Sequence, residues 1–225
     1  MKVLFVGNSY TYCNNLPTLL QDLATTAGKA LEARMVTSGG KSLEWHWYNP
    51  ETLDAIGKGP WDFVVLQDHS LHAIEEPDKL RSAATKLAGR IRAGNATPVL
   101  YVTWARQHIP EMQDTITATY LQVAREIGAR VAPVGPAWRK ALAAAPGLVL
   151  HTEDRSHPNL LGSYLAACVF YATLFGETPV GLSNTFQLQE GVTAVIDKDK
   201  AALLQQMAWA AVREPGGQQR LSPQP

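Results

Sequence analysis

Apolar positions along the chain follow two different periods. Short apolar runs alternate with longer segments in which apolar residues recur every three or four positions. The short runs predict strands and the longer segments predict helices, because side chains alternate across a strand but recur about every 3.6 residues on a helix. The predicted strands are residues 2–6, 31–36, 63–66, 98–103 and 130–134. The predicted helices are residues 16–27, 50–56, 78–93, 110–127, 138–144, 158–175 and 198–212.

Strands that alternate with helices are typical of βαβ units, in which helices cover both faces of a parallel sheet. We therefore predict an α/β fold of three layers, α/β/α, around a flavodoxin-like parallel sheet of about five strands. Ligand sites of such sheets lie at the carboxyl ends of the strands. Chemically useful side chains follow four predicted strands, and we expect them to meet at this edge. They lie in residues 7–11, 38–42, 67–70 and 104–108.

The length of the chain limits the number of domains. Its 225 residues suffice for one domain with a sizeable core, since a chain of roughly 200 residues buries about 70% of the surface that it exposes when unfolded. We predict a single domain over residues 1–213. Residues 214–225 are rich in proline, glycine and glutamine and predict a loose tail without a catalytic role.

Composition argues against several kinds of partner. The 20 basic and 20 acidic side chains cancel to a formal net charge of zero, which offers no electrostatic footprint for nucleic acid or an anionic membrane. No stretch reaches the ~20 apolar residues of a membrane span, and the apolar start is too short for a signal peptide, so we expect a soluble, cytoplasmic protein. The two cysteines, Cys13 and Cys168, fit no disulfide or metal-ligand pattern and predict reduced thiols.

A serine stands directly after the first predicted strand, in Gly7-Asn8-Ser9-Tyr10-Thr11. At a strand-to-loop turn above a sheet, its hydroxyl is exposed enough to attack a carbonyl carbon. Its own backbone N–H can then face the developing oxyanion. Taken alone, such residues are more typical of an ordinary turn.

A base for this serine stands near the other end of the chain, in Asp154-Arg155-Ser156-His157-Pro158, just before the long apolar helix. A serine hydroxyl needs an imidazole base whose tautomer is held by a carboxylate. The three-residue spacing lets the carboxylate of Asp154 reach Nδ1 of His157 within one loop. An aspartate and a proline at a helix start also serve as ordinary capping residues.

A nucleophile turn after the first strand, paired with an Asp-x-x-His loop before the last long helix, resembles the SGNH hydrolases, also called GDSL-type esterases and lipases. The resemblance covers residues 1–176. It implies that Ser9 is the nucleophile, His157 the base and Asp154 the carboxylate that orients the base. Asn8 stands where the family usually has aspartate; this is a small departure, because that side chain is not the catalytic acid of these enzymes.

The resemblance also implies an oxyanion hole. Its donors would be the backbone N–H of Ser9, that of either Gly39 or Gly40, and a side-chain amide after the third strand. In this last block the family has Gly-x-Asn-Asp, whereas residues 67–70 contain no asparagine. We take Gln67 as the candidate third donor, because its amide is equivalent to that of asparagine with one more methylene of reach. Glutamine also occurs here in esterase branches that act on acetylated sugars.

Three side chains near the same edge are candidates to line a substrate pocket, namely Trp45, His69 and Trp104. Aromatic faces can bind an acyl group or a sugar, but they equally often pack within loops. The histidines show no metal-ligand spacing, since the pair His69 and His72 falls short of the three or four ligands of a zinc site. We therefore expect neither a metal nor another cofactor.

These features predict a serine esterase that hydrolyses a short-chain ester, such as an acetyl ester, with a carbohydrate as one candidate alcohol. An acyltransferase is an alternative, because both reactions share an acyl-enzyme on Ser9. A flavodoxin-like module that binds a small ligand without chemistry is another, although residues 7–11 lack the repeated glycines and lysine of a phosphate cradle. The expected partner is a small-molecule or carbohydrate ester, not nucleic acid, and the sequence leaves the oligomeric state open.

Overall fold

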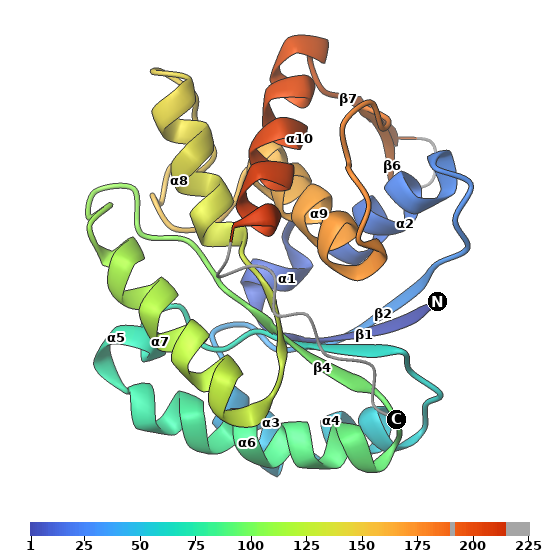
Figure 1. The fold of residues 1–225 in the computed structure, drawn as a ribbon, viewed down its shortest axis with the longest axis vertical. Helices are drawn as coiled ribbons and strands as arrows, with labels where there is room; N and C mark the ends of the chain where they lie inside the picture. Colours follow the sequence, from blue (N-terminus) through green and yellow to red (C-terminus); the bar gives the residue numbers. More distant parts are fainter. Residues whose placement is uncertain (190–191, 215–225) are drawn as a thin grey trace.

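The computed structural model describes residues 1–189 and 192–214 of the chain. A five-stranded parallel sheet lies at its centre, with helices on both faces (Figure 1). Its strands, in spatial order, are β2 (Glu32–Thr37), β1 (Lys2–Gly7), β3 (Phe63–Leu66), β4 (Thr97–Tyr101) and β5 (Arg130–Ala132). The predicted three-layer α/β/α fold with about five parallel strands is confirmed.

The alternation of side chains across each strand divides the apolar residues into two cores. Along β1, Val3 and Phe5 pack into one core, while Leu4 and Val6 pack into the other. One core is covered by α2 (Leu16–Thr26), α8 (Val134–Ala144), α9 (Leu160–Phe175) and α10 (Lys198–Arg213). The other is covered by α3 (Leu43–Tyr48), α4 (Pro50–Gly57), α5 (His72–Glu75), α6 (Pro77–Ala93) and α7 (Met112–Ile127).

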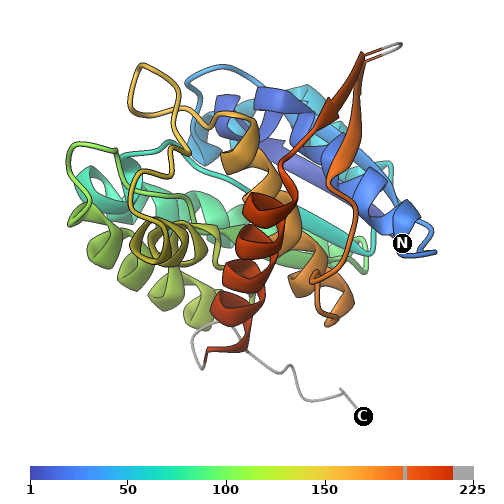
Figure 2. The ribbon, with the colours of Figure 1, turned by 90° about the horizontal axis from the view of Figure 1, so that it is seen from above.

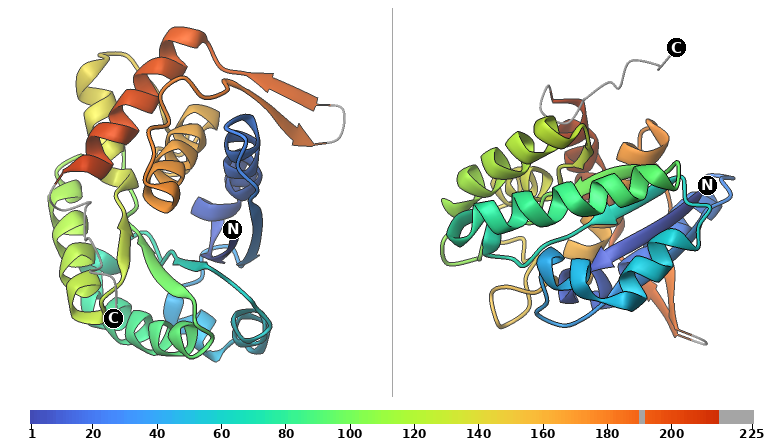
Figure 3. Two further views of the ribbon diagram at one scale, coloured as in Figure 1. Left: turned by 45° about the vertical axis from the view of Figure 1, so that its right-hand side comes forward. Right: turned by 90° about the horizontal axis from the view of Figure 1, so that it is seen from below.

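Helix α9 is apolar on all sides because other helices surround it. It packs against α2, α8 and α10, and the side chains from Gly162 to Ala172 are all buried. Figures 2 and 3 show α10 lying across α9 on its outer side. Since α2 follows the serine turn and α9 follows the aspartate–histidine loop, the packing of these two helices brings the two ends of the predicted site together.

Several short elements lie where the sequence predicted none, among them α3, α5 and a pair of strands. Helix α3 occupies a segment with no predicted element, and it begins where Oγ of Ser42 accepts a hydrogen bond from the N–H of Trp45 at 3.3 Å. An antiparallel pair, β6 (Thr185–Gln189) and β7 (Val192–Val195), lies outside the central sheet, where no strands were predicted. It is attached through Phe186, which is buried beside Tyr164.

Three further expectations concern the rest of the chain. Beyond Glu214, the predicted tail lies outside the described residues. Within 1–189 and 192–214, no helix is both long and apolar enough to span a membrane. Cys13 and Cys168 are both free thiols, as predicted.

The register of the sheet sets the edge at which the site forms. Gly7 at the end of β1 pairs with Thr37 at the end of β2, and Val6 pairs with Leu66 at the end of β3. The loops that leave these strands therefore start side by side. They carry the serine turn, the two candidate glycines and residues 67–70 to one edge of the sheet.

Candidate active site

The turn that carries Ser9 is shaped by Asn8. Asn8 is the N-cap of the short helix α1 (Ser9–Tyr12), and its Oδ1 accepts a hydrogen bond from the N–H of Tyr10 at 3.1 Å. Its Nδ2 donates to the carbonyl oxygen of Lys41 at 2.9 Å, which ties the turn to the loop after β2. Ser9 is thus the first helical residue after a sharp change of direction, with its side chain half-buried at the strand edge.

The side chain of Gln67 holds this turn in place through hydrogen bonds. Its Oε1 accepts hydrogen bonds from the N–H of Asn8 at 2.8 Å and from Oγ1 of Thr11 at 2.9 Å. The close approach requires glycine at position 7, because a Cβ there would lie 2.5 Å from the same Oε1. The fully buried Gln67 side chain therefore fixes the backbone on both sides of Ser9.

The loop before α9 folds around the carboxylate of Asp154. Its Oδ1 accepts the N–H groups of Ser156 and His157, each at 2.9 Å, and the hydroxyl of Thr152 at 2.8 Å. Its Oδ2 hydrogen-bonds to Nδ1 of His157. Arg155 takes a left-handed conformation with φ of 60° to complete the tight loop. The three-residue spacing thus places the carboxylate against the imidazole, as expected.

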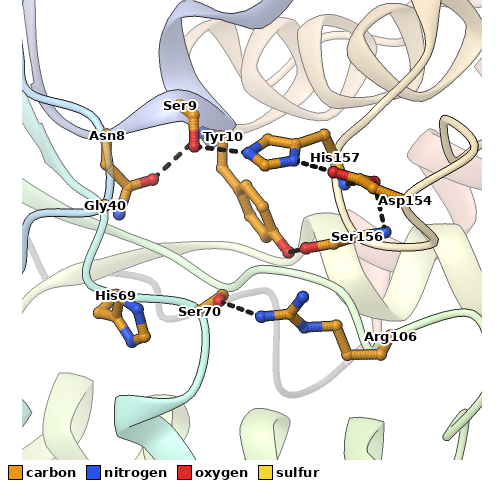
Figure 4. A pocket seen from close by; sticks show the side chains of 10 residues that line it. All are labelled: Asn8, Ser9, Tyr10, Gly40, His69, Ser70, Arg106, Asp154, Ser156 and His157. Atoms are coloured by element: carbon orange, nitrogen blue, oxygen red, sulfur yellow. Dashed lines mark hydrogen bonds and ion pairs between the residues drawn. The ribbon is translucent and has the colours of Figure 1, made fainter.

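The two distant segments meet at a hydrogen bond. Nε2 of His157 lies 2.8 Å from Oγ of Ser9 (Figure 4). With Asp154 accepting the proton on Nδ1, Nε2 of a neutral imidazole is free to accept the serine hydroxyl proton. The structure therefore brings Ser9, His157 and Asp154 into the order hydroxyl, imidazole, carboxylate, which is the arrangement that activates a serine nucleophile.

Hydrogen bonds keep Asp154 ionised. Partial burial opposes the charge, but the side chain and backbone N–H of His157, the N–H of Ser156 and the hydroxyl of Thr152 together hold its pKa well below the usual range. A carboxylate that stays charged at neutral pH can stabilise an imidazolium beside it.

A cavity of about 220 Å³ opens in front of Ser9 and His157 (Figure 4). Its walls come from the serine turn and from loops that follow β2, β3 and β4, together with the loop before α9. The residues that line it are Asn8, Ser9, Tyr10, Gly40, His69, Ser70, Arg106, Asp154, Ser156 and His157.

The structure distinguishes the two candidate glycines. Gly40 lines the cavity and has a φ of 67°, a conformation that favours glycine. Gly39 does not line it, and a Cβ there would lie 3.1 Å from the hydroxyl of Tyr12. Of the two candidate glycines, Gly40 is therefore the one that lies at the cavity wall.

Gln67, the predicted third oxyanion donor, is not brought to the cavity. Its Oε1 bonds to the serine turn and its Nε2 donates to the carbonyl oxygen of Asp68. Both ends of the amide bond inside the protein and the side chain is fully buried, so the geometry does not support the donor role that the sequence suggested. The prediction failed because the side chain of the first residue after β3 points inward.

His69, two residues further on, reaches the cavity instead. Its Nδ1 accepts the N–H of Leu71 at 3.4 Å, which leaves the ring proton on Nε2. Burial lowers the pKa of His69, and the neighbouring His72, whose own pKa is raised by its hydrogen bond to Asp68, lowers it further. A neutral imidazole therefore lines the cavity, and its Nε2 makes no hydrogen bond within residues 1–189 and 192–214.

The two tryptophans predicted for the pocket lie elsewhere. Trp104 is buried between the rings of Tyr10 and Trp138, which stack on it at 4.6 and 4.1 Å. Its Nε1 donates to the carbonyl oxygen of Ser156 at 2.9 Å, so it supports the site from beneath. Trp45 is half-buried on α3, with the ammonium of Lys41 5.8 Å from its ring, and it does not line the cavity.

Several cavity residues lie in the segments expected at this edge but were not singled out from the sequence. Tyr10 packs edge-on against the ring of His157, and its hydroxyl lies 2.6 Å from Oγ of Ser156. Arg106 and Ser70 lie together on the cavity floor, where Nη2 of Arg106 donates to Oγ of Ser70 at 3.1 Å. Only their places just after predicted strands could have suggested them. Within residues 1–189 and 192–214, no group of three or more metal-binding side chains occurs.

Comparisons with known proteins add to this geometry. No family model and no curated protein matches the chain. Among solved structures, the chain is similar to a DUF4886 family protein from Bacteroides uniformis, with 22% identity, a TM-score of 0.80 and 96% of each chain covered. It is also similar to a "putative SGNH hydrolase" from Slackia heliotrinireducens, with 30% identity and a TM-score of 0.67 over 77% of this chain and 98% of that one. An acetyl xylan esterase from Geobacillus stearothermophilus is similar at 17% identity, with a TM-score of 0.58 over 75% of this chain and 92% of that one.

Proposed function

The chain belongs to the SGNH hydrolase family, and from this membership we propose that it is a serine esterase that cleaves a short-chain ester through an acyl-enzyme on Ser9. The observation that carries the proposal is the pair of hydrogen bonds that joins Ser9 to His157 and His157 to Asp154. No other arrangement in the cavity offers both an activated nucleophile and a base whose tautomer is fixed.

In the first half of the reaction, Oγ of Ser9 attacks the ester carbonyl carbon, and the hydroxyl proton of Ser9 passes to Nε2 of His157. The imidazolium that forms is stabilised by Asp154, with which it shares the Nδ1 proton. The tetrahedral intermediate then collapses and its bond to the alcohol oxygen breaks. The Nε2 proton goes to that oxygen, so a neutral alcohol leaves and the acyl group stays on Ser9.

In the second half, water attacks the acyl carbon and gives its proton to Nε2 of His157. When this second intermediate collapses, the bond to Oγ breaks and the proton returns to Ser9. The products are a carboxylic acid and the free enzyme. Each half begins and ends with a neutral imidazole, so His157 is ready to act as the base again after every cycle.

Three donors around the cavity would bind the oxyanion. Two are the backbone N–H groups of Ser9 and Gly40, which lie on neighbouring loops at the strand edge. The third is Nε2–H of His69, in place of the side-chain amide that the family has in this block. A neutral imidazole is suited to this role because it donates a hydrogen bond without losing a proton.

The size of the cavity favours a small acyl group. Its volume of about 220 Å³ must hold the acyl group and the first atoms of the alcohol. An acetyl ester meets this limit, and the similarity to an acetyl xylan esterase supports the same class. We therefore propose acetyl esters as the substrates, with a carbohydrate as one candidate alcohol.

Hydrolysis of p-nitrophenyl acetate tests the proposal, with p-nitrophenyl octanoate as the long-chain comparison. Ser9→Ala and His157→Ala should each abolish turnover, and Asp154→Asn should lower kcat by about 10³- to 10⁴-fold because the imidazole loses its fixed tautomer. Ser82→Ala and Glu153→Gln are the matched controls, since both residues are exposed and lie outside the cavity. Turnover that persists in Ser9→Ala would refute the proposal.

A further inference from the structure

A cationic side chain lies in the cavity beside the proposed catalytic residues. Arg106 comes from the loop between β4 and α7, and its guanidinium points across the cavity floor to Ser70 (Figure 4). The hydrogen bond to Ser70 uses one of the five N–H donors of the group. The remaining donors form a planar fork that matches the geometry of a carboxylate.

The charge of Arg106 has no protein counterion in the described part of the chain. Among residues 1–189 and 192–214, no carboxylate oxygen lies within 4.0 Å of its guanidinium, whereas arginines such as Arg81 and Arg139 pair with acidic groups on the surface. Asp154, the one carboxylate that lines the cavity, is committed to His157. A half-buried guanidinium without a counterion is available to pair with an anion that enters the cavity.

The loop that carries Arg106 is held in place by the loop before α9. The N–H of Gln107 donates to the carbonyl oxygen of Arg155 at 3.0 Å, and Nε1 of Trp104 donates to that of Ser156 at 2.9 Å. These contacts lie on both sides of Arg106 in the sequence. The guanidinium is therefore preorganised with respect to the loop that carries the proposed base, so little freedom is lost when an anion binds.

The position of Arg106 indicates which part of an ester it would meet. His157 gives its proton to the departing alcohol, so the alcohol part must lie on the side of the imidazole. In Figure 4, Arg106 enters from the side of His157 and Asp154, with Tyr10 and Ser156 between its guanidinium and the imidazole, whereas Gly40 and Asn8 line the opposite side. A charge on the far end of the alcohol part would therefore lie on the side of the cavity that holds the guanidinium, and a charge on the acyl part would lie on the side of Gly40 and Asn8.

We propose that Arg106 binds a carboxylate on the alcohol part of the substrate, so that the preferred substrates are O-acetylated hydroxy acids, a class that includes acetylated sugar acids. This inference rests on the proposed esterase function. Ser70 holds the guanidinium in the orientation that presents its free donors to the carboxylate. Neutral acetyl esters enter the same cavity but lack this contact.

Matched aryl acetates test the inference. The probes are 3- and 4-acetoxybenzoate and the corresponding acetoxybenzamides, which have the same shape without the charge. We expect kcat/KM to favour an acid over its amide, and Arg106→Gln to lower this preference about 10- to 100-fold, mainly through KM. Arg106→Lys should keep part of this preference. Arg81→Gln, at a half-buried arginine of α6 that does not line the cavity, should keep all of it.

Three outcomes separate this inference from the proposed function. An equal loss of kcat on acids and amides in Arg106→Gln would overturn it in favour of a role in stabilising the oxyanion. Equal use of acids and amides by the wild-type protein would also overturn it, while Ser9-dependent hydrolysis would leave the esterase proposal standing.

If no ester is hydrolysed, the binding of 4-acetoxybenzoate to the wild-type protein and to Arg106→Gln, measured by calorimetry, still tests the inference. Binding that does not weaken in the variant contradicts the inference.

Discussion

Ser9 and His157 are 148 positions apart in the sequence, and their side chains lie 2.8 Å apart. Their meeting depends on the packing of α2 against α9, the helices that follow the two loops. Asn14 joins these loops directly, since its Nδ2 donates to the carbonyl oxygen of Pro158 at 3.1 Å and to Oγ of Ser163 at 2.9 Å. The core of the protein thus fixes the distance between the proposed nucleophile and its base.

Replacement of Gly40 separates backbone strain from oxyanion binding. Gly40 and Gly28 have φ values of 67° and 70°, and a Cβ at either would meet no atom within 4 Å. Alanine at either position should therefore lower the free energy of unfolding by about 1 kcal/mol. Only Gly40→Ala should also lower kcat, by roughly tenfold or more, because the strained backbone would shift the N–H that we propose as an oxyanion donor. Urea denaturation and ester hydrolysis measure the two effects, and equal kcat values for the two variants would argue against the role of Gly40.

His69 should contribute to catalysis rather than to stability. His69→Ala removes the proposed third oxyanion donor, so we expect kcat to fall about 100- to 1000-fold. His69→Asn should retain more activity, because a side-chain amide can donate a similar hydrogen bond. The exposed His108 provides the control variant, His108→Ala, with kcat close to that of the wild type. If the loss in His69→Ala is accompanied by an equally large loss of stability, the side chain acts on the fold instead.

Gln67, unlike His69, should contribute to the stability of the fold rather than directly to catalysis. Gln67→Ala leaves the N–H of Asn8 and the hydroxyl of Thr11 without their buried acceptor and opens a small cavity, so we expect the free energy of unfolding to drop by about 2–4 kcal/mol. Gln122→Ala, at an exposed position of α7, should change it by no more than about 0.5 kcal/mol. A Gln67→Ala protein as stable as the wild type but catalytically inactive would restore Gln67 as a direct oxyanion donor.

His46 should make the stability of the protein depend on pH. It is fully buried, with Nε2 2.8 Å from the carbonyl oxygen of Gly7 and Nδ1 2.8 Å from Oγ1 of Thr52. Burial lowers its pKa. Below about pH 6.5 the unfolded chain binds a proton that the folded protein does not, so stability present above that pH is lost as the pH falls toward the lowered pKa.

The free energy of unfolding, measured by urea denaturation between pH 5 and pH 8, tests this expectation. It should fall more steeply on acidification in the wild type than in His46→Gln, which has no imidazole to protonate. His108→Gln, at an exposed loop position, should keep the slope of the wild type. An unchanged slope in His46→Gln would show that this buried imidazole does not control the acid sensitivity.

The fold was predictable because its strongest signals are local. Strands such as Phe63–Leu66 are continuous apolar runs, and the buried helix α9 is apolar throughout. Helix α3 was missed because its six residues form less than two turns, too few to show a helical period. Strand β6 was missed because its five residues alternate too briefly to stand out as a strand.

The site was only partly predictable because loops hide the directions of side chains. Position after a strand placed Ser9 and residues 67–70 at the correct edge. It could not show that Gln67 points into the protein while His69 points into the cavity, since neighbouring loop residues follow no fixed period. For the same reason Trp104 looked like a binding surface, although stacking on both of its faces buries it.

Labelling with a fluorophosphonate tests the central claim most directly, because it reports an activated serine without knowledge of the substrate. Mass spectrometry of the wild-type protein should locate the phosphonyl group on Ser9. Labelling should be lost in Ser9→Ala, strongly reduced in His157→Ala and unchanged in Ser82→Ala. A wild-type protein that stays unlabelled, or that is labelled at another residue, would contradict the account.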